Sequence, residues 1–496
     1  MGKQTFLLPP GLSADVLREL ERACVAGGQD NMPWPTETRI ENGRLIVRRG
    51  VDESGYLVVP WDIDGAGRLM GTSATLMERA QPYHFQIELA RGKINQLRCQ
   101  AADWELGGLQ IPPELEQKIR EAGRTFGKAI AVYPSEQAGP LAQQALTQAY
   151  QAADELVHVY IEQAFQIRHQ RQPRFETILG CRLGAVVPEG EEAAALGRAC
   201  NGVAIPFCWS DVEPEQGTFH WEPHDELLDW AAARGLQVTA GPLIDFSSAR
   251  LPGWLWLWER DLPSLATYMC QYVEQVVKRY RKRIRRWQIT AASNWANVLS
   301  LGEDELLWLT VRLAEVARQI DPTLELIVGI AQPWGEYMAL EDRIQSPFIF
   351  ADTLIRSALN LSALDIEIIM GVAPRGSYCR DLLETWRMLN LYVLLGVPLR
   401  VTLGYPAAKA PDPRADPDQC VVTGHWHGGY SPAIQADWAS DFAALALCRP
   451  QVQAVHWVHL SDAHPHQFPH CGLFDAKGNP RPVLQRLQAL REQHLS

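Results

Sequence analysis

The sequence predicts an α/β fold whose larger part is a (β/α)8 TIM barrel, with a β-sandwich-like module before it and a long helical connector between the two. Three patterns lead to this prediction. Beyond residue 175, apolar segments typical of buried strands recur about every thirty to fifty residues and alternate with amphipathic helical stretches. Residues 138–172 form one long Ala-, Gln- and Leu-rich helical pattern, and the residues before it alternate β-branched or aromatic side chains with polar ones.

Length and charge limit the class of protein. The chain has 496 residues, enough for two or three domains and a large core. Charged residues make up 21% and hydrophobic residues 47%, which is typical of an ordered globular chain. The formal net charge of -12 argues against nucleic acid or an anionic membrane as the partner, because both attract clustered Lys and Arg. Oligomeric state is not specified by these features.

The ten cysteines are spread along the chain without a Cys-x-x-Cys pair, as expected for reduced thiols. The first residues contain no apolar segment of the kind that signal peptides have. No apolar run reaches the ~18–20 residues that a membrane span needs. We therefore expect a cytoplasmic protein with no membrane partner.

Residues 1–135 are predicted to form the β-rich module. A helix is expected over residues 13–26, followed by strands over residues 38–49, 56–63, 68–77 and 83–100. Asn42-Gly43 inside the first of these strand regions indicates a hairpin turn. A sandwich attached to an enzyme suggests carbohydrate binding by analogy. Its aromatic residues could form a stacking platform, although core packing is the stronger interpretation; they are Trp34, Trp61, Tyr83 and Trp104.

Residues 136–174 are predicted to be the connector, and residues 175–496 the barrel. Eight strand-and-helix units account for the barrel. The expected strands are 178–186, 202–205, 237–243, 286–290, 325–330, 366–372, 399–403 and 452–457. The expected helices are 191–199, 223–234, 262–282, 303–320, 348–358, 379–394, 431–448 and 480–493.

Four segments of the barrel carry specific motifs. Residues 209–219 read Trp-Ser-Asp-Val-Glu-Pro-Glu-Gln-Gly-Thr-Phe, and residues 251–254 read Leu-Pro-Gly-Trp. Residues 279–287 contain Arg-Tyr, Ile and Trp at fixed spacing, and residues 472–482 read Gly-Leu-Phe-Asp-Ala-Lys-Gly-Asn-Pro-Arg-Pro. These motifs resemble those of the family 10 glycoside hydrolases, the endo-1,4-β-xylanase type, over about residues 175–490. The resemblance implies a TIM barrel that acts on β-linked polysaccharide by retaining hydrolysis.

The positions that carry the family's chemistry differ here. The family's acid/base glutamate ends the strand-four motif Trp-Asp-Val-Val-Asn-Glu, whereas residues 287–292 of this chain end in Ala291 and Ala292. The family's nucleophilic glutamate follows Ile-Thr after strand seven, where this chain has Leu403. Sugar-binding polar positions of the family align with Ala204, Cys208 and Pro242. Because alanine and leucine can neither transfer a proton nor attack a sugar, the family's mechanism cannot run at these positions.

Three other carboxylates follow predicted strands and are the candidate catalytic residues: Asp245, Glu336 and Asp462. Each also has a structural interpretation. Glu336 could pair with Arg375 or another loop cation, Asp245 could cap a turn before Ser247, and Asp462 could make a structural hydrogen bond. Aromatic, amide and cationic residues near the strand ends are the candidate sugar-binding residues. They are Trp209, Trp254, Asn294, Trp295, Asn297, Trp334, Arg375, Tyr378, Tyr405 and His459.

Histidines are concentrated after strand seven, and His464, His466 and His470 raise the question of a metal site. Their spacing matches no standard zinc pattern, so loop histidines that form hydrogen bonds across the barrel mouth are the preferred interpretation and no metal is expected. The long loop that contains residues 411–430 is predicted to close over the barrel. The chain has no phosphate loop, dinucleotide motif or Gly-x-Ser-x-Gly elbow, so no cofactor is expected.

Two functions remain in competition. The first is a carbohydrate-binding or regulatory relative of the family that does not hydrolyse its ligand. The second is an active glycoside hydrolase with relocated carboxylates, Glu336 together with Asp245 or Asp462. Carboxyl groups at the separation that glycosidases need favour the second, and carboxylates held in ion pairs with loop arginines favour the first.

Overall fold

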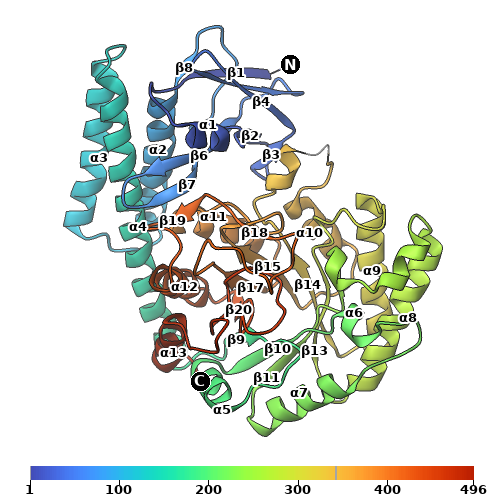
Figure 1. Ribbon diagram of the computed structural model, residues 1–496. Coiled ribbons are helices and arrows are strands. Elements are labelled where there is room, and N and C mark those ends of the chain that lie inside the picture. The colour runs from blue at the N-terminus through green and yellow to red at the C-terminus, as the bar shows by residue number, and fades with distance from the viewer. Residues whose placement is uncertain (1, 341–342) are drawn as a thin grey trace.

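The computed structural model describes residues 2–340 and 343–496. Figure 1 shows a closed barrel ringed by helices, with the N-terminal part of the chain lying across one side of it. The predicted barrel, N-terminal module and long helix are all present. Helices α2, α3 and α4 stand beside the N-terminal sheets, and α4 continues down along the barrel, where it contacts α11 and α12 (Figure 1).

Two sheets form the N-terminal module. The first has the order β4-β5-β1-β8 and contains β1 (Gly2–Leu7), β4 (Thr36–Glu41), β5 (Arg44–Arg49) and β8 (Tyr83–His84). The second joins β3 (Met32–Trp34), β2 (Cys24–Gly27), β6 (Tyr56–Ile63) and β7 (Gly67–Thr72). The predicted hairpin lies between β4 and β5, where Asn42 and Gly43 both take positive φ angles of 50° and 70°.

Two predictions within this module are wrong. The strand expected over residues 83–100 ends at His84, and helix α2 (Phe85–Leu106) follows. The buried positions Ala90, Ile94, Leu97 and Ala101 recur every three or four residues, so one helical face is covered although several residues favour strands. The helix expected over residues 13–26 is shorter, α1 (Ala14–Leu20), because the chain turns into β2.

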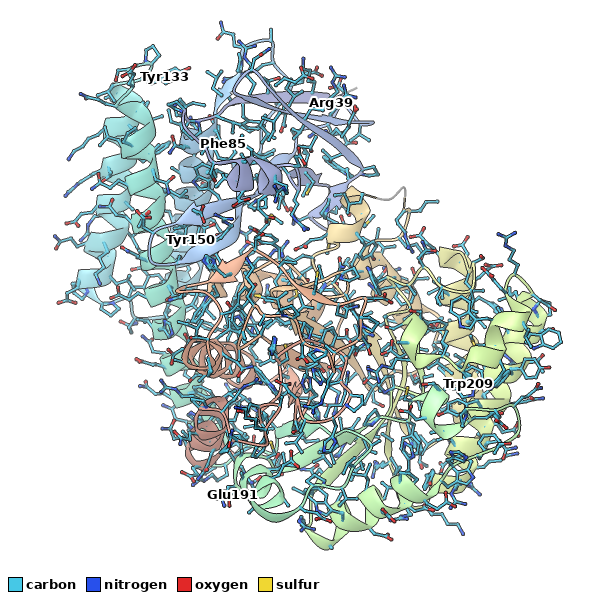
Figure 2. The ribbon with its side chains drawn as sticks, viewed as in Figure 1. Arg39, Phe85, Tyr133, Tyr150, Glu191 and Trp209 are labelled. Atoms are coloured by element: carbon cyan, nitrogen blue, oxygen red, sulfur yellow. The ribbon has the colours of Figure 1, made fainter. Side chains whose placement is uncertain are left out.

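The long connector is confirmed as helix α4 (Ala138–Arg171). It packs against α2 and against α3 (Pro113–Ala131), which the sequence did not predict. Figure 2 places Phe85 at the start of α2 and Tyr150 on α4, both facing the sheets of the module. Both are buried, as are Trp61, Tyr83 and Trp104, which confirms core packing for these three aromatic residues.

The barrel is one sheet with parallel neighbours in the order β11-β10-β9-β20-β17-β15-β14-β13-β12, closed by a further pairing between β11 and β13. β11 and β12 are two pieces of the third stave, so eight staves result. The strands are β9 (Ile178–Arg182), β10 (Gly202–Ile205), β11 (Gln237–Ala240), β12 (Ile244–Asp245), β13 (Arg286–Ala291), β14 (Glu325–Ile330), β15 (Ala363–Ile369), β17 (Leu399–Gly404) and β20 (Val452–Trp457).

All eight predicted barrel helices are present with ends shifted by at most a few residues. They are α5 (Gly190–Ala199), α7 (Glu222–Ala233), α8 (Leu262–Tyr280), α9 (Glu303–Ile320), α10 (Pro347–Arg356), α11 (Leu382–Val393), α12 (Pro432–Leu447) and α13 (Val483–His494). None of the helices described is long and apolar enough to cross a membrane. All ten cysteines are free thiols.

The loop after β17 connects the barrel to the N-terminal module through backbone pairing. Its residues His425 and Trp426 form the short strand β19 (His425–Trp426), which pairs antiparallel with β7 and so extends the second N-terminal sheet. Earlier in the same loop, Asp416 pairs with Arg250 of the loop after strand three, with 3.2 Å between the charged atoms. The loop therefore crosses the barrel mouth, as the sequence predicted.

Candidate functional site at the barrel mouth

A cavity of about 300 Å³ opens at the carboxyl end of the barrel strands. The loops after β9, β10, β12 and β20 line it, which is the face where TIM barrels carry their chemistry. Its charged and polar walls include Arg182, Asp211, Asp245, Arg250, His459 and His466. Its described lining residues include no tryptophan or tyrosine, the side chains on which sugar rings usually stack.

Asp245 is held in a buried ion triad. The Nη1 atom of Arg375 lies 2.7 and 2.8 Å from the two carboxylate oxygens of Asp245, and its Nη2 and Nε atoms lie 2.8 and 3.1 Å from those of Glu367. The Arg375 side chain is fully buried. Burial alone raises the pKa of Asp245, but the charge and hydrogen bonds of Arg375 outweigh burial and hold that pKa below its usual range.

The turn-cap interpretation of Asp245 is confirmed at the same time. Its Oδ1 accepts the backbone N–H of Ser247 at 3.0 Å and the Ser247 hydroxyl at 2.8 Å. The Ser247 hydroxyl oxygen in turn accepts a hydrogen bond from Arg375 at 2.7 Å. Asp245 is therefore fully engaged by neighbouring side chains and backbone.

Glu336 begins a 3-10 helix (Glu336–Ala339) after β14 and pairs with Arg380 rather than with Arg375. Its carboxylate also accepts the backbone N–H of Tyr378 at 3.0 and 3.2 Å. The Tyr378 hydroxyl donates to Glu19 of the N-terminal module at 2.7 Å. Glu336 thus belongs to the contact between module and barrel and does not line the mouth cavity.

Asp462 lies in the loop after β20 and is almost completely buried. It pairs with Arg481 at 2.7 Å, accepts from His459 Nε2 at 2.7 Å and accepts the backbone N–H of Gly472 at 2.8 Å. Burial alone raises its pKa, but the His459 hydrogen bond and the nearby charges outweigh burial and lower it. Burial lowers the pKa of His459 to about 4, so this imidazole is neutral at pH 7.

The positions that match the family's catalytic glutamates lie in the apolar interior. Ala292 follows β13, is fully buried and has a φ of 59°, a left-handed conformation that is uncommon for residues other than glycine. Leu403 near the end of β17 is 1% exposed. The carboxylates of the Arg375 triad lie beside these positions in the sheet, since Asp245 pairs with Ala291 and Glu367 pairs with Thr402.

Several predicted sugar-binding residues are structural. Trp209 is buried and stacks on Tyr272, and its indole N–H donates to Glu213 at 2.8 Å (Figure 2 labels Trp209). Trp254 donates to the backbone carbonyl of Glu213 at 3.2 Å and meets Trp209 edge-on. Glu213 also accepts the backbone N–H of Gly217 at 2.7 Å, so the motif at residues 209–219 stabilises the second loop through packing and hydrogen bonds.

Other candidates brace neighbouring loops. Asn294 exchanges two hydrogen bonds with the backbone of Ala331, at 2.8 and 3.0 Å. The Tyr405 hydroxyl donates to the carbonyl of Gly429 and accepts the N–H of Trp426, both at 3.0 Å. Trp295 packs beside the N-terminal module, and Asn297 is exposed.

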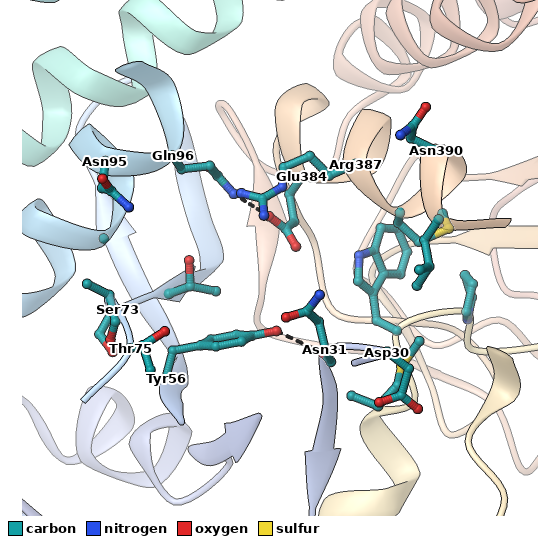
Figure 3. A pocket seen from close by; sticks show the side chains of 18 of the residues that line it. Asp30, Asn31, Tyr56, Ser73, Thr75, Asn95, Gln96, Glu384, Arg387 and Asn390 are labelled. Carbon is teal, nitrogen blue, oxygen red and sulfur yellow. Dashed lines mark hydrogen bonds between the residues drawn. The ribbon is translucent and has the colours of Figure 1, made fainter. Parts of the chain in front are cut away.

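Trp334 lines a second cavity, of about 350 Å³, between the N-terminal module and the barrel. Figure 3 shows this junction cavity with side chains from three elements, β6, α2 and α11, turned toward one another. Tyr56 donates to the backbone carbonyl of Asn31 at 2.7 Å across one wall. The amide, hydroxyl and charged residues that line the junction cavity include Asp30, Asn31, Thr75, Asn95, Gln96, Glu384, Arg387 and Asn390.

Sequence reasoning missed Glu367, Arg380 and Arg481, which fix the predicted carboxylates. Glu367 is the residue that a signal could have revealed, because it and Asp365 are two charged residues inside an otherwise apolar, buried strand, β15. Arg380 and Arg481 lie in or beside loops and carry no comparable pattern. The structure therefore distributes the predicted site residues over the mouth cavity, the junction cavity and the packed loops between them.

The family profile and the related proteins that match this chain all point to the same family of glycosidases. The profile described as "Glycosyl hydrolase family 10" matches residues 193–293. Endo-1,4-beta-xylanase B of Humicola insolens is 26% identical over 169 residues, covering 34% of this chain and 41% of that protein. Endo-1,4-beta-xylanase C of Paenibacillus barcinonensis is 21% identical over 216 residues, covering 38% of this chain and 19% of that protein. This chain therefore spans less than half the length of either relative.

Among solved structures, native xylanase 10B from Thermotoga maritima is 15% identical, with a TM-score of 0.48 and coverage of 67% of this chain and 97% of that one. The profile match and the xylanase relatives confirm that the barrel resembles glycosyl hydrolase family 10. Together with the eight-stave parallel sheet, they define the class of protein: a xylanase-like TIM barrel.

Proposed function

We propose that this chain is a carbohydrate-binding relative of the family 10 glycoside hydrolases that does not hydrolyse its ligand. The observation that carries the proposal is the Arg375 triad, in which one buried arginine binds both Asp245 and Glu367, while Ala292 and Leu403 occupy the family's catalytic positions. Retaining hydrolysis needs two carboxyl groups ~5–5.5 Å apart, one free to attack the sugar and one able to give a proton.

The alternative of relocated carboxylates is disfavoured by the ion pairs. Each of the three candidate carboxylates forms an ion pair with a different arginine: Asp245 with Arg375, Glu336 with Arg380, and Asp462 with Arg481. A general acid must keep its proton near neutral pH, whereas the pKa values of Asp245 and Asp462 are lowered. Carboxylates that are held in ion pairs with arginines favour binding over hydrolysis.

The junction cavity supports the sugar-binding part of the proposal. Its volume falls in the range of small-ligand sites, and it combines the Trp334 indole with several side-chain amides. Among the described residues, the amides of Asn31 and Asn390 have no side-chain hydrogen bond of their own and are available to ligand hydroxyls. The relatives named endo-1,4-beta-xylanases make β-1,4-xylo-oligosaccharides the first ligands to test.

Isothermal titration of the purified chain with xylo-oligosaccharides and cello-oligosaccharides tests the proposal. We expect binding heat for at least one series, and at least a tenfold weaker affinity for Trp334→Ala. Trp308→Ala is the matched control, because Trp308 is 49% exposed and lines neither the mouth cavity nor the junction cavity. Absence of binding to both series, or equal affinity of the two variants, would overturn the assignment of the junction cavity.

The remaining parts of the proposal concern location and partners. We infer a cytoplasmic protein, which the ten free thiols support. Carbohydrate is the proposed partner, and the net charge of -12 disfavours nucleic acid and anionic membranes.

A further inference from the structure

A large groove lies beside the junction cavity, between the helices of the N-terminal module and the side of the barrel. Its volume is about 840 Å³, which is within the range of small-ligand sites. Residues of α2 and α4 form one wall, and residues of α11 and of the segment after α12 form the other. We call it the helix groove. It shares no described lining residue with the mouth cavity.

The helix groove and the junction cavity meet on α11. Arg387 and Asn390 lie one turn apart on that helix and line both. On α2, Asn95 and Gln96 line the junction cavity and Gln100 lines the helix groove, so the same two helices run past both. Figure 3 shows Arg387 and Asn390 among the side chains around the junction cavity. A ligand that is longer than the junction cavity can therefore continue into the helix groove.

Three aromatic rings give the helix groove an apolar lining. The rings of Trp104 on α2 and Tyr160 on α4 are stacked, with 4.4 Å between their centroids. The ring of Trp386 on α11 meets both edge-on, at centroid distances of 5.0 and 5.8 Å. Because the three rings pack against one another, they form a fixed apolar surface for the CH groups of a sugar.

Polar side chains without partners line the same groove. Gln100 is only 9% exposed, and its amide forms no hydrogen bond with any residue that the structure describes. A side-chain amide offers both donors and an acceptor, so it can bind a sugar hydroxyl in either direction. Arg171 and Arg387 are exposed, and within the described chain neither forms a hydrogen bond or an ion pair. The groove therefore contains hydrogen-bonding groups that the protein itself does not use.

The charge of the helix groove is opposite to that of the whole chain. Its described lining residues carry three arginines, Arg168, Arg171 and Arg387, and one carboxylate, Asp103, which leaves a local charge of +2. The formal net charge of the chain is -12. Arg168 donates to the Thr177 hydroxyl at 2.7 Å, so the two exposed arginines are the ones available to a ligand. Arginine binds carboxylates with two parallel hydrogen bonds, so the groove suits a ligand that carries carboxylates.

From these features we propose that the helix groove binds the carboxylate-bearing part of an acidic oligosaccharide, whose neutral part occupies the junction cavity. Arg171 and Arg387 pair with the sugar carboxylates, and the rings pack against the aromatic lining. The junction cavity is lined by the carboxylates Asp30 and Glu384, which repel a second acidic group and favour neutral sugar there. This inference rests on the proposed sugar binding at the junction and adds the chemical class of the sugar.

Isothermal titration of the full chain tests the inference with two matched ligands. They are cellohexaose and the same oligosaccharide after oxidation of its C6 hydroxymethyl groups to carboxylates. We expect the oxidised sugar to bind about tenfold more tightly, as two exposed ion pairs allow, and the difference to shrink at high salt. Arg171→Gln should weaken binding of the oxidised sugar about threefold. Arg124→Gln is the matched control, because Arg124 is an exposed arginine that lines neither the junction cavity nor the helix groove.

The outcomes separate this inference from the proposed function. Equal affinity for the two sugars, or equal affinity of the two arginine variants for the oxidised sugar, would overturn the assignment of the helix groove and leave neutral sugar binding intact. Binding of the oxidised sugar alone supports the helix groove and counts against neutral sugar at the junction. If neither sugar binds, the inference fails, and the titration with xylo-oligosaccharides shows whether the proposed function fails with it.

Discussion

Removal of the Arg375 side chain is the sharpest test of the buried triad. In Arg375→Met, Asp245 and Glu367 lose their shared cation, and the local charge changes from one net negative charge to two. Loss of one partner of a buried ion pair costs about 3–5 kcal/mol. For 496 residues unfolding together, an unfolding entropy of about 1 kcal/mol per kelvin turns this cost into a fall in Tm of about 3–5 °C.

The pH dependence of the stability of Arg375→Met provides a second test. In the wild type, the lowered pKa of Asp245 contributes stability that is present above its unfolded pKa of about 3.9 and is lost as pH falls through the lower folded value. Without Arg375, burial raises that pKa, so the variant should gain stability relative to the wild type as pH falls toward 5. Calorimetric Tm values from pH 8 to 5 measure both effects. A variant within 1 °C of the wild type at every pH would refute the reasoning.

Three further predictions address the junction, the barrel interior and the lost nucleophile. Lys93→Met should lower the free energy of unfolding, measured in urea, by about 3–5 kcal/mol, because Lys93 is buried and its ammonium lies 2.9 Å from Asp381. Lys118 is exposed, so Lys118→Met should change the free energy of unfolding by less than about 1 kcal/mol. Burial and the charges of three arginines lower the pKa of His456. The free energy of unfolding should therefore fall by up to about 1.4 kcal/mol for each pH unit below about pH 6.5. Measurements of Tm against pH should show a shallower dependence for His456→Gln than for the wild type. Leu403→Glu buries an unpaired carboxylate and should lower Tm by several degrees without any release of reducing sugar; appearance of such release would contradict it.

The barrel could be predicted from sequence because its strands are short apolar runs that helical segments separate. Strands β10, β14 and β20 begin and end at the predicted residues. Helix α2 was missed because Phe85, Ile87 and Ile94 favour strands when read singly, and packing against α4 decides between the two. Propensity alone carries no information about that packing.

The site was harder to predict than the fold. The candidate carboxylates were found because they follow strands, but their partners depend on side chains that meet across the barrel. Arg375 reaches Asp245, 130 residues away in sequence, and leaves Glu336 to Arg380. Trp209 was predicted to bind sugar, yet it is buried and stacks on Tyr272 of α8. Burial of this kind follows from tertiary contacts and not from local sequence.

A time course of xylohexaose with the wild-type chain tests the central claim most directly, that the barrel retains the family's fold but not its reaction. Chain lengths of the sugar are followed chromatographically at protein concentrations that give full binding in the titration. The proposed function predicts bound sugar whose length does not change over days. Shortening of the sugar by the wild type, abolished in Glu336→Gln, would contradict it and establish a hydrolase with relocated carboxylates.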